Sequence, residues 1–196
     1  MSAFAKVPVT MSAQEFLAWN PDDGQAWQLV DGEPQAMSPA NRTHGTLQSE
    51  MARVIGNHLL DLDSPCSVVT EPGIVPHVQS SHNVRIPDLA VTCAPYDTEE
   101  PTLTDPILVI EILSPTNQAQ TWANVWAYTT IPSVREIVVL RTVTIAADLL
   151  RRQPDGTWPR EPERITDGNL VLDSISLPTP LAGLYRRTRL NRPPKA

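Results

Sequence analysis

Two acidic residues stand in apolar runs of the sequence that are typical of β-strands. Asp88 lies within residues 84–91, and Glu111 lies within residues 107–115. A buried carboxylate is costly unless another group compensates its charge. Carboxylate oxygens are hard ligands that suit Mg²⁺ or Mn²⁺, with waters filling the remaining positions. The pair therefore indicates a divalent-cation site, and such an ion can activate a water for attack on a phosphoryl group.

The two carboxylates meet only if their strands are neighbours in a sheet. Side chains alternate along a strand, and the residues that share one face of the second run are Ile107, Val109, Glu111 and Leu113. Asp88 directly follows a proline, which cannot donate to a ladder and marks a strand end. On adjacent strands the Cβ atoms of Asp88 and Glu111 would lie roughly 5 Å apart. The spacing leaves a second interpretation open, in which Glu111 pairs with Arg85 and Asp88 caps a turn.

The composition is that of an ordinary globular protein. The chain has 196 residues, 41% of them apolar, and a net charge of -7, which fits one domain over residues 1–196 with a core at about residues 10–187. No apolar run is long enough for a membrane span, and the N-terminus has no signal-peptide core. We therefore expect no membrane partner and a cytoplasmic location. Cys66 and Cys93 are too few for a disulfide scaffold, so we expect reduced thiols.

The basic residues are unevenly distributed along the chain. There are 15 of them, and the only lysines are Lys6 and Lys195, far from the carboxylates in the sequence. The arginines cluster at two places, which are Arg151–Arg152 and the C-terminal set Arg186, Arg187, Arg189 and Arg192. The acidic balance argues mildly against a nucleic-acid partner, because phosphate binding needs local positive charge. Two roles remain open for the C-terminal set, namely a solvated surface or contact with phosphate.

The first part of the chain predicts two helices and a hairpin. Ser12 and Glu15 have the spacing of a capping box, which predicts a short helix as far as about Trp19. Asp31-Gly32 separates two short β-like runs, residues 27–30 and 33–37, and predicts a hairpin. A long helix is expected over about residues 41–62, because apolar residues recur there at steps of three and four. These residues are Leu47, Met51, Val54, Ile55, Leu59 and Leu62.

The second part of the chain predicts mainly strands. In addition to the two runs that carry the carboxylates, strands are expected at residues 67–70, 74–78, 137–140 and 143–150, and a helix at residues 117–128. The C-terminal stretch is rich in proline and gives no clear pattern. This order of elements predicts an α/β (α+β) fold with a central mixed β-sheet flanked by helices.

The surroundings of both carboxylates resemble a known family. The matching segments are residues 83–91, 108–115, 127–128 and 134–136, preceded by residues 29–33, 37–39 and His44. Over about residues 10–187 the chain resembles the restriction-endonuclease-like (Uma-type) family of the PD-(D/E)XK nuclease superfamily. The resemblance implies a restriction-endonuclease-like core, metal-dependent hydrolysis of phosphodiester bonds and DNA as the substrate. A homodimer follows by analogy, because cutting both DNA strands usually needs two sites.

The resemblance also implies roles for individual residues. Asp88 and Glu111 would be ligands of Mg²⁺ or Mn²⁺, and the backbone carbonyl of Ile112 would be a third ligand. His44 matches a family position and could accept a proton or contact phosphate. A lone histidine near a helix start is also common as a surface or packing residue, so both interpretations of His44 stay open.

Two positions depart from the pattern of the family. The wider superfamily has a lysine two residues after the glutamate, where this chain has Leu113, and the family has its lysine on the following helix, where this chain has Asn124. The family also has a glutamate before the Leu-Val-Asp-Gly turn, where this chain has Gln28. An amide can orient a water but brings no positive charge to the reacting phosphate. Two hypotheses follow: an active metal-dependent endonuclease, or a weakened or inactive relative that binds nucleic acid or a protein partner.

Overall fold

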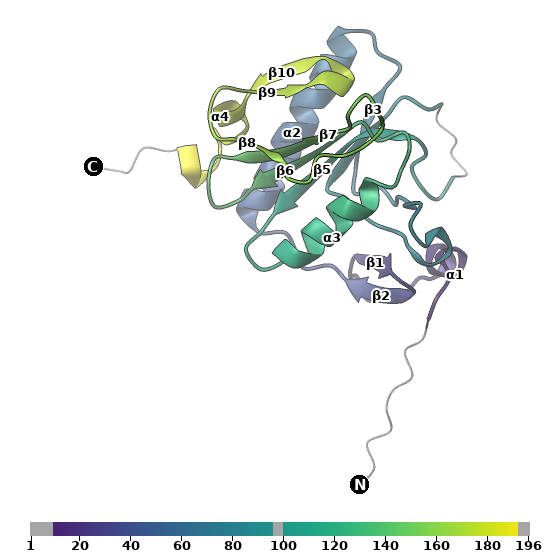
Figure 1. The fold of residues 1–196 in the computed structure, drawn as a ribbon. Helices are drawn as coiled ribbons and strands as arrows, with labels where there is room; N and C mark the ends of the chain where they lie inside the picture. Colours follow the sequence, from purple (N-terminus) through teal and green to yellow (C-terminus); the bar gives the residue numbers. More distant parts are fainter. Residues whose placement is uncertain (1–9, 96–99, 192–196) are drawn as a thin grey trace.

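The centre of the molecule is a six-stranded mixed β-sheet. The structure is a computed structural model that describes residues 10–95 and 100–191. The strands lie in the order β3 (Ser67–Thr70), β4 (Leu89–Thr92), β5 (Pro106–Leu113), β6 (Glu136–Arg141), β7 (Ala147–Arg151) and β8 (Glu163–Ile165). β5 and β6 run parallel, whereas the other neighbours run antiparallel. The predicted mixed sheet flanked by helices is confirmed (Figure 1).

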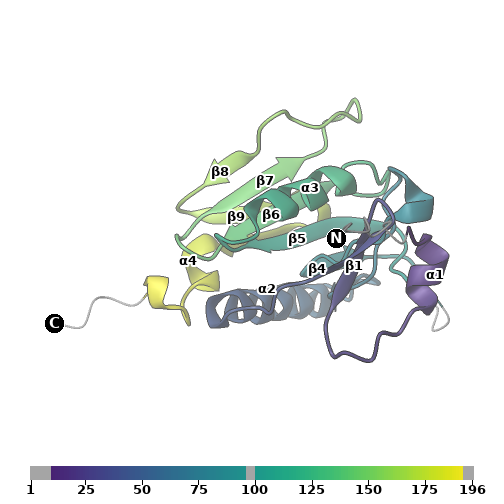
Figure 2. The ribbon, with the colours of Figure 1, turned by 90° about the horizontal axis from the view of Figure 1, so that it is seen from below.

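Two helices cover opposite faces of this sheet (Figure 2). α2 (Arg42–Asp61) turns its apolar stripe toward one face. α3 (Gln118–Tyr128) packs Val125 and Tyr128 against the other. Ile107 departs from the predicted alternation of β5 and packs on the α2 side, next to the register shift between β4 and β5. In the described part of the chain, no helix is both long and apolar enough to cross a membrane.

The ends of α2 coincide with the predicted ends. Asn41 is the N-cap, and its side chain accepts a hydrogen bond of 3.0 Å from His44 N. Leu62 is the C-cap. An N-cap oxygen satisfies one of the free N–H groups of the first helical turn and so fixes where the helix begins. The cap therefore also fixes the position of His44 in that first turn.

The N-terminal elements form a separate hydrophobic cluster beside the sheet. They are α1 (Ala13–Ala18), β1 (Trp27–Val30) and β2 (Glu33–Ala36). Ser12 and Glu15 make both hydrogen bonds of the predicted capping box. The predicted hairpin is also confirmed, and it turns at Asp31 and Gly32, which both have positive φ. A bridge from Leu29 ties the hairpin to the body of the protein, and this brings β1 close to the end of the central sheet.

The C-terminal stretch adds a hairpin and a short helix on the α2 side of the sheet. The elements are β9 (Asn169–Leu172), β10 (Leu177–Pro180) and α4 (Leu181–Leu184), with short 3₁₀ helices at Asp173–Ile175 and Arg189–Asn191. A further 3₁₀ helix, at Ser80–His82, lies between β3 and β4. Tyr185 follows α4 and is fully buried. Its hydroxyl accepts a hydrogen bond of 3.2 Å from Arg141 N and lies 2.9 Å from Ala146 O. Tyr185 therefore anchors the last described residues beside the end of β6.

Three predicted strands differ from the structure. Residues 74–78 form no strand, and Ile74 makes only an isolated bridge to Arg85. The run at residues 84–91 is a strand only from Leu89 onward. Prolines interrupt both runs, and a proline cannot donate to a ladder. The strand predicted from residue 143 begins at Ala147, because the preceding residues make the bend between β6 and β7.

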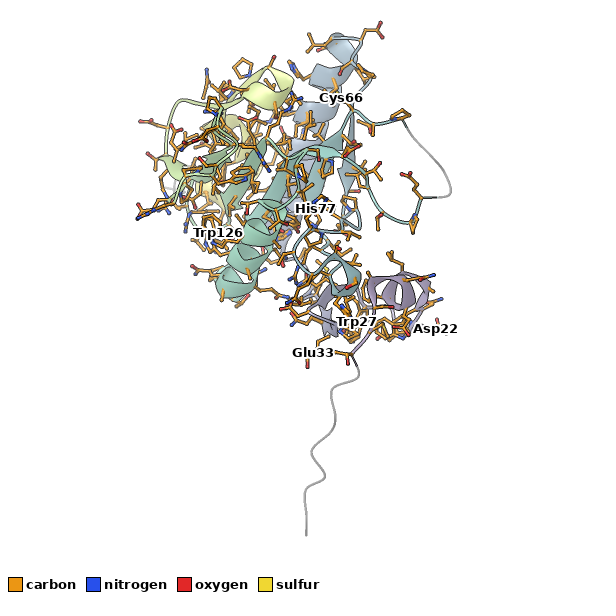
Figure 3. All side chains as sticks on the ribbon, turned by 45° about the vertical axis from the view of Figure 1, so that its right-hand side comes forward. Asp22, Trp27, Glu33, Cys66, His77 and Trp126 are labelled. Atoms are coloured by element: carbon orange, nitrogen blue, oxygen red, sulfur yellow. A yellow bond between two sulfur atoms is a disulfide. The ribbon has the colours of Figure 1, made fainter. Side chains whose placement is uncertain are left out.

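The prediction of reduced thiols is wrong, because Cys66 and Cys93 form a disulfide. Cys66 lies between α2 and β3 (Figure 3). β3 and β4 pair with Ser67 opposite Thr92, so the next position outward places the two cysteines opposite each other. Sequence spacing does not reveal such a register. The expectation of a cytoplasmic location therefore loses the support that free thiols gave it.

Candidate active site

Asp88 and Glu111 lie side by side at the end of two neighbouring central strands. β4 and β5 pair antiparallel, with Leu89 opposite Ile110. Continued by one residue, this register places Asp88 opposite Glu111, which is the arrangement that the strand pattern predicted. The two residues are only 9% and 6% exposed. Both nevertheless line one cleft of about 570 Å³.

The Asp88 carboxylate is held by two short contacts. Its Oδ1 atom lies 2.6 Å from His44 Nε2, and its Oδ2 atom accepts a hydrogen bond of 2.6 Å from Ile112 N. A carboxylate oxygen can accept more than one bond, so each oxygen keeps capacity for a further partner. The N–H and C=O groups of one residue face the same edge of a strand, so the Ile112 carbonyl is on the Asp88 side of β5. His44, Asp88 and Ile112 thus come together at one point.

Glu111 is held by a tyrosine and is electrostatically unfavourable as an anion. The Tyr128 hydroxyl donates a hydrogen bond of 2.9 Å to Glu111 Oε1. Burial raises the pKa of Glu111 well above its ordinary value, and the negative charge of Asp88 raises it further. The nearby side chains of Tyr128 and Asn124 lower this pKa. A cation between the two carboxylates would therefore favour the ionised form of Glu111.

The amide side chains of Asn124 and Gln28 contact each other. Asn124 Nδ2 donates a hydrogen bond of 3.1 Å to Gln28 Oε1. Asn124 lies on α3, Gln28 lies on β1, and both side chains are buried at the edge of the cleft. Asn124 Oδ1 is buried and has no hydrogen-bond partner among the described residues. An unpaired buried oxygen is costly, so Asn124 Oδ1 is an unfavourable feature beside the cleft.

The interpretation in which Arg85 neutralises Glu111 does not hold. Within the described ranges Arg85 makes no ion pair. Its side chain is buried, its Nε atom lacks a hydrogen-bond partner, and burial lowers its pKa. Of the described residues that line the cleft, none is an arginine or a lysine. Among the described residues, therefore, no arginine or lysine closes off the carboxylates, and the basic side chain in contact with them is His44.

The oxygen atoms of the cleft fit a small hard cation. No three His, Cys, Asp or Glu side chains in the described residues gather into a metal-binding group of their own. Mg²⁺, however, is commonly bound through one or two carboxylates and keeps several waters. Asp88, Glu111 and the Ile112 carbonyl offer this kind of oxygen set. They do not resemble a Zn²⁺ site, which uses mainly histidine and cysteine ligands.

Two residues of this region are absent from the predicted site. Tyr128 lies four residues after Asn124, so both are on one face of α3, and this spacing could have identified it. Glu71 also lines the cleft, and its N–H donates to Asp88 O at 3.1 Å. Gln48 Nε2 donates to Glu71 Oε1 and to Asp88 O, both at 3.1 Å. Glu71 follows β3 at the level of Asp88, which only the strand register reveals.

This fold is shared with a nuclease-like protein of known structure. A crystal structure from Anabaena variabilis ATCC 29413, described as a putative nuclease belonging to DUF820, matches with a TM-score of 0.72. The two sequences are 19% identical, and the match covers 89% of this chain and 97% of that chain. At this identity the likeness establishes the common fold.

The chain belongs to the Uma2 family, whose description is "Putative restriction endonuclease". The sequence model of this family matches residues 13–186. A relative is the uncharacterized protein slr1290 of Synechocystis sp. (strain ATCC 27184 / PCC 6803 / Kazusa). It is 25% identical over 178 residues, which are 90% of this chain and 92% of that protein. The resemblance carried by the carboxylate motifs is confirmed, and the family is one of nuclease-type hydrolases.

Proposed function

We propose that the protein is a metal-dependent endonuclease that hydrolyses phosphodiester bonds in DNA. The observation that carries this proposal is the meeting of Asp88 and Glu111 in one cleft of a restriction-endonuclease family member. Two neighbouring buried carboxylates, with no lysine or arginine among the described residues of their cleft, are unfavourable for folding. A strongly perturbed group in a cleft, such as Glu111, is typical of a functional site.

Asp88, Glu111 and the Ile112 carbonyl would hold Mg²⁺ or Mn²⁺. When bound, such an ion neutralises phosphoryl charge and lowers the pKa of a coordinated water. His44 Nε2 holds Asp88, and the Tyr128 hydroxyl holds Glu111. Both contacts orient the carboxylates, as partners of metal ligands usually do.

Three polar side chains would complete the catalytic site around the carboxylates. Asn124 lines the cleft, and its amide can orient the attacking water by a hydrogen bond. Gln28 holds the Asn124 amide in place through their mutual hydrogen bond. His44 lines the cleft as well as contacting Asp88, so it is within reach of a bound phosphate.

The same amides support a second candidate function. Neither Asn124 nor Gln28 carries a charge, and no lysine or arginine is among the described cleft residues. A positioned cation near the transferring phosphoryl group can be worth about 10²–10⁵ in rate. The alternative is therefore a weakened or inactive nuclease-fold protein that binds nucleic acid or a protein partner without cutting.

Three further features belong to the proposal. We expect residues 1–196 to act as a single domain, since β1 from the N-terminal part contributes Gln28 to the site. A homodimer would supply two sites, one for each DNA strand. A cytoplasmic location would give the enzyme access to DNA.

A cleavage assay separates the two candidate functions. Plasmid DNA is incubated with the purified protein and Mg²⁺ or Mn²⁺, and nicked and linear products are quantified. Cutting that is lost in Asp88→Ala supports the enzyme, because the variant removes one proposed ion ligand. Cutting that appears only in Asn124→Lys supports a weakened site.

The control variant is Asp167→Asn, which neutralises an exposed acidic residue outside the cleft. It should cut like the parent. Isothermal titration with Mg²⁺ measures ion binding independently of cutting. If neither the parent nor Asn124→Lys cuts DNA, and the parent binds no Mg²⁺ or Mn²⁺, the nuclease proposal is overturned.

A further inference from the structure

The N-terminus of α2 forms a wall between two clefts. Ala40 and His44 line the carboxylate cleft, whereas Asn41 lines a second cleft of about 530 Å³. The segment before α3 is shared in the same way, because Pro115 lines the second cleft and Asn117 lines the first. The two clefts are therefore separated only by these short segments. The second cleft therefore lies next to the carboxylate cleft.

The second cleft is basic although the protein as a whole is acidic. Arg42, Arg187 and Arg189 line it, and none of its described lining residues is Asp or Glu. No ion pair joins these three arginines to any residue that the structure describes. The chain carries a net charge of -7. Three arginines without acidic partners in one cleft thus concentrate positive charge at a single place.

The other clustered arginines have structural partners. Arg151 pairs with Glu136 and with Asp173, at 2.9 Å and 3.0 Å. Arg152 donates to backbone carbonyls and lies 5.0 Å from the ring centre of Trp158. Arg192 lies outside the described residues. Among the described arginines of the two clusters, Arg187 and Arg189 are the ones that line this cleft.

The segment that carries Arg187 and Arg189 is held in place on both sides. Arg186 Nη2 forms a 2.8 Å ion pair with Glu50 of α2. The Thr188 hydroxyl is buried, donates to Tyr185 O at 2.7 Å and accepts from Leu190 N at 3.2 Å. The backbone around both arginines is thus ordered before any ligand binds. Ordering of this kind lowers the entropic cost of binding.

The start of α2 adds to the positive potential of this cleft. The helix has 20 residues, and its first turn contains no acidic residue. The partial positive charge of a helix N-terminus attracts anions. Arg42 is the first residue of the helix, so its guanidinium and the helix dipole act on the same region.

From these contacts we infer that the cleft of Arg42, Arg187 and Arg189 binds backbone phosphates of the DNA strand that occupies the carboxylate cleft. This role presupposes the proposed function, and it specifies which surface carries the substrate beyond the reacting phosphate. Guanidinium groups match phosphate oxygens with two parallel hydrogen bonds. Phosphate contacts position a duplex but do not read its sequence. The cleft should therefore contribute equally to the binding of every DNA sequence.

Binding to a fluorescein-labelled DNA duplex, measured by fluorescence anisotropy in EDTA, tests this role without cutting. The test variant is Arg187→Gln/Arg189→Gln. The matched control is Arg135→Gln/Arg160→Gln, which removes the same charge from two exposed arginines at the opposite end of β6. Salt is varied between about 50 and 200 mM, because each lost phosphate contact lowers the slope of log K against log salt by about 0.9.

We expect the test variant to bind about tenfold to a hundredfold more weakly than the control and to lose about 2 from the salt slope. The loss should be the same for duplexes of unrelated sequence. If test and control variants weaken equally, or if the parent binds no duplex, the inference is overturned. If the parent still cuts plasmid DNA in either of these two cases, the proposed endonuclease function stands although the inference about this cleft fails. If the parent binds DNA through these arginines but never cuts it, the phosphate-binding role of this cleft is supported and the endonuclease activity is not.

Discussion

The side chains of Asn124 and Gln28 are hydrogen-bonded at 3.1 Å although 96 positions separate them in the sequence. The family resemblance implies a lysine and a glutamate at these two positions, so we expect a charge pair where this chain has an amide pair. Because the two side chains are in contact, a change at one position acts on the other. Replacing only one member of a buried charge pair leaves the charge of its partner uncompensated.

The first prediction concerns the coupling between these two residues. Asn124→Lys and Gln28→Glu should each destabilise the protein, because each places one new charge in a buried position. The double variant should be more stable than the sum of both changes by about 0.5–3 kcal/mol. Urea denaturation of the parent, both single variants and the double variant measures this coupling. Strictly additive effects would contradict a direct contact between the two side chains.

The second prediction concerns ion binding at Glu111. Saturating Mg²⁺ should stabilise the parent by about 2–4 kcal/mol at 100 to 1,000 times the dissociation constant. Because burial and Asp88 raise the pKa of Glu111, the folded protein holds this proton to a higher pH than the unfolded chain does. The metal-free protein therefore loses stability as the pH rises through that pKa, and the gain from Mg²⁺ should grow over the same interval.

Glu111→Gln is the informative variant for this second prediction. Glutamine keeps the shape of the side chain but has no ionisable carboxyl group. The part of the fall in stability with pH that comes from ionisation of Glu111 in the metal-free protein should therefore disappear. It should also abolish the Mg²⁺-dependent rise in Tm. The exposed Asp167→Asn should behave like the parent in both respects. An equal Mg²⁺ effect in parent and Glu111→Gln would place the ion elsewhere.

The third prediction concerns the disulfide between Cys66 and Cys93, which are the only cysteines of the chain. The cross-link closes a loop with a sequence separation of 27 residues. Cys66→Ser/Cys93→Ser should lower the free energy of unfolding by about 2–4 kcal/mol. A reductant should lower the Tm of the parent and leave that of the double variant unchanged. Titration of free thiols in protein purified without reductant checks the bond directly, and two reactive thiols would refute it.

Local patterns predicted the elements that are determined by local interactions. The three- and four-residue spacing of apolar residues predicted α2 at about residues 41–62, and Asp31-Gly32 predicted the hairpin. The run at residues 74–78 had the composition of a strand but formed none, because its proline and its single bridge do not support a ladder. Composition alone therefore fails where pairing with a distant strand decides the outcome.

The candidate site was predictable in its centre and not in its surroundings. Asp88 and Glu111 stood out because each interrupts an apolar run, and the register of β4 and β5 brings them together. Glu71 reaches the cleft through pairing of β3 with β4, which sequence spacing does not encode. The roles of these residues stay predictions until the variants are measured. The C-terminal anchor at Tyr185 was equally invisible, because its partners lie in β6 and the bend that follows.

The fourth prediction concerns this anchor. Burial raises the pKa of Tyr185 to about 12. An unfolded tyrosine ionises near pH 10, so the unfolded chain loses this proton first, and stability should fall between about pH 10 and pH 12. Burial also raises the pKa of Tyr128, which adds to this fall, so the variant isolates the part that belongs to Tyr185. The stability of Tyr185→Phe should depend less steeply on pH over this interval.

At neutral pH, Tyr185→Phe should lower the free energy of unfolding by about 1–3 kcal/mol, because the hydroxyl's hydrogen bonds to the backbone at Arg141 and Ala146 are lost. It should also loosen the segment that carries Arg187 and Arg189 and so weaken DNA binding more than Arg135→Gln/Arg160→Gln does. Urea denaturation at a series of pH values and DNA anisotropy measure the two effects. Parallel pH profiles for parent and Tyr185→Phe would contradict the raised pKa. Unchanged DNA binding in a destabilised variant would show that the anchor supports the fold but does not position the arginines.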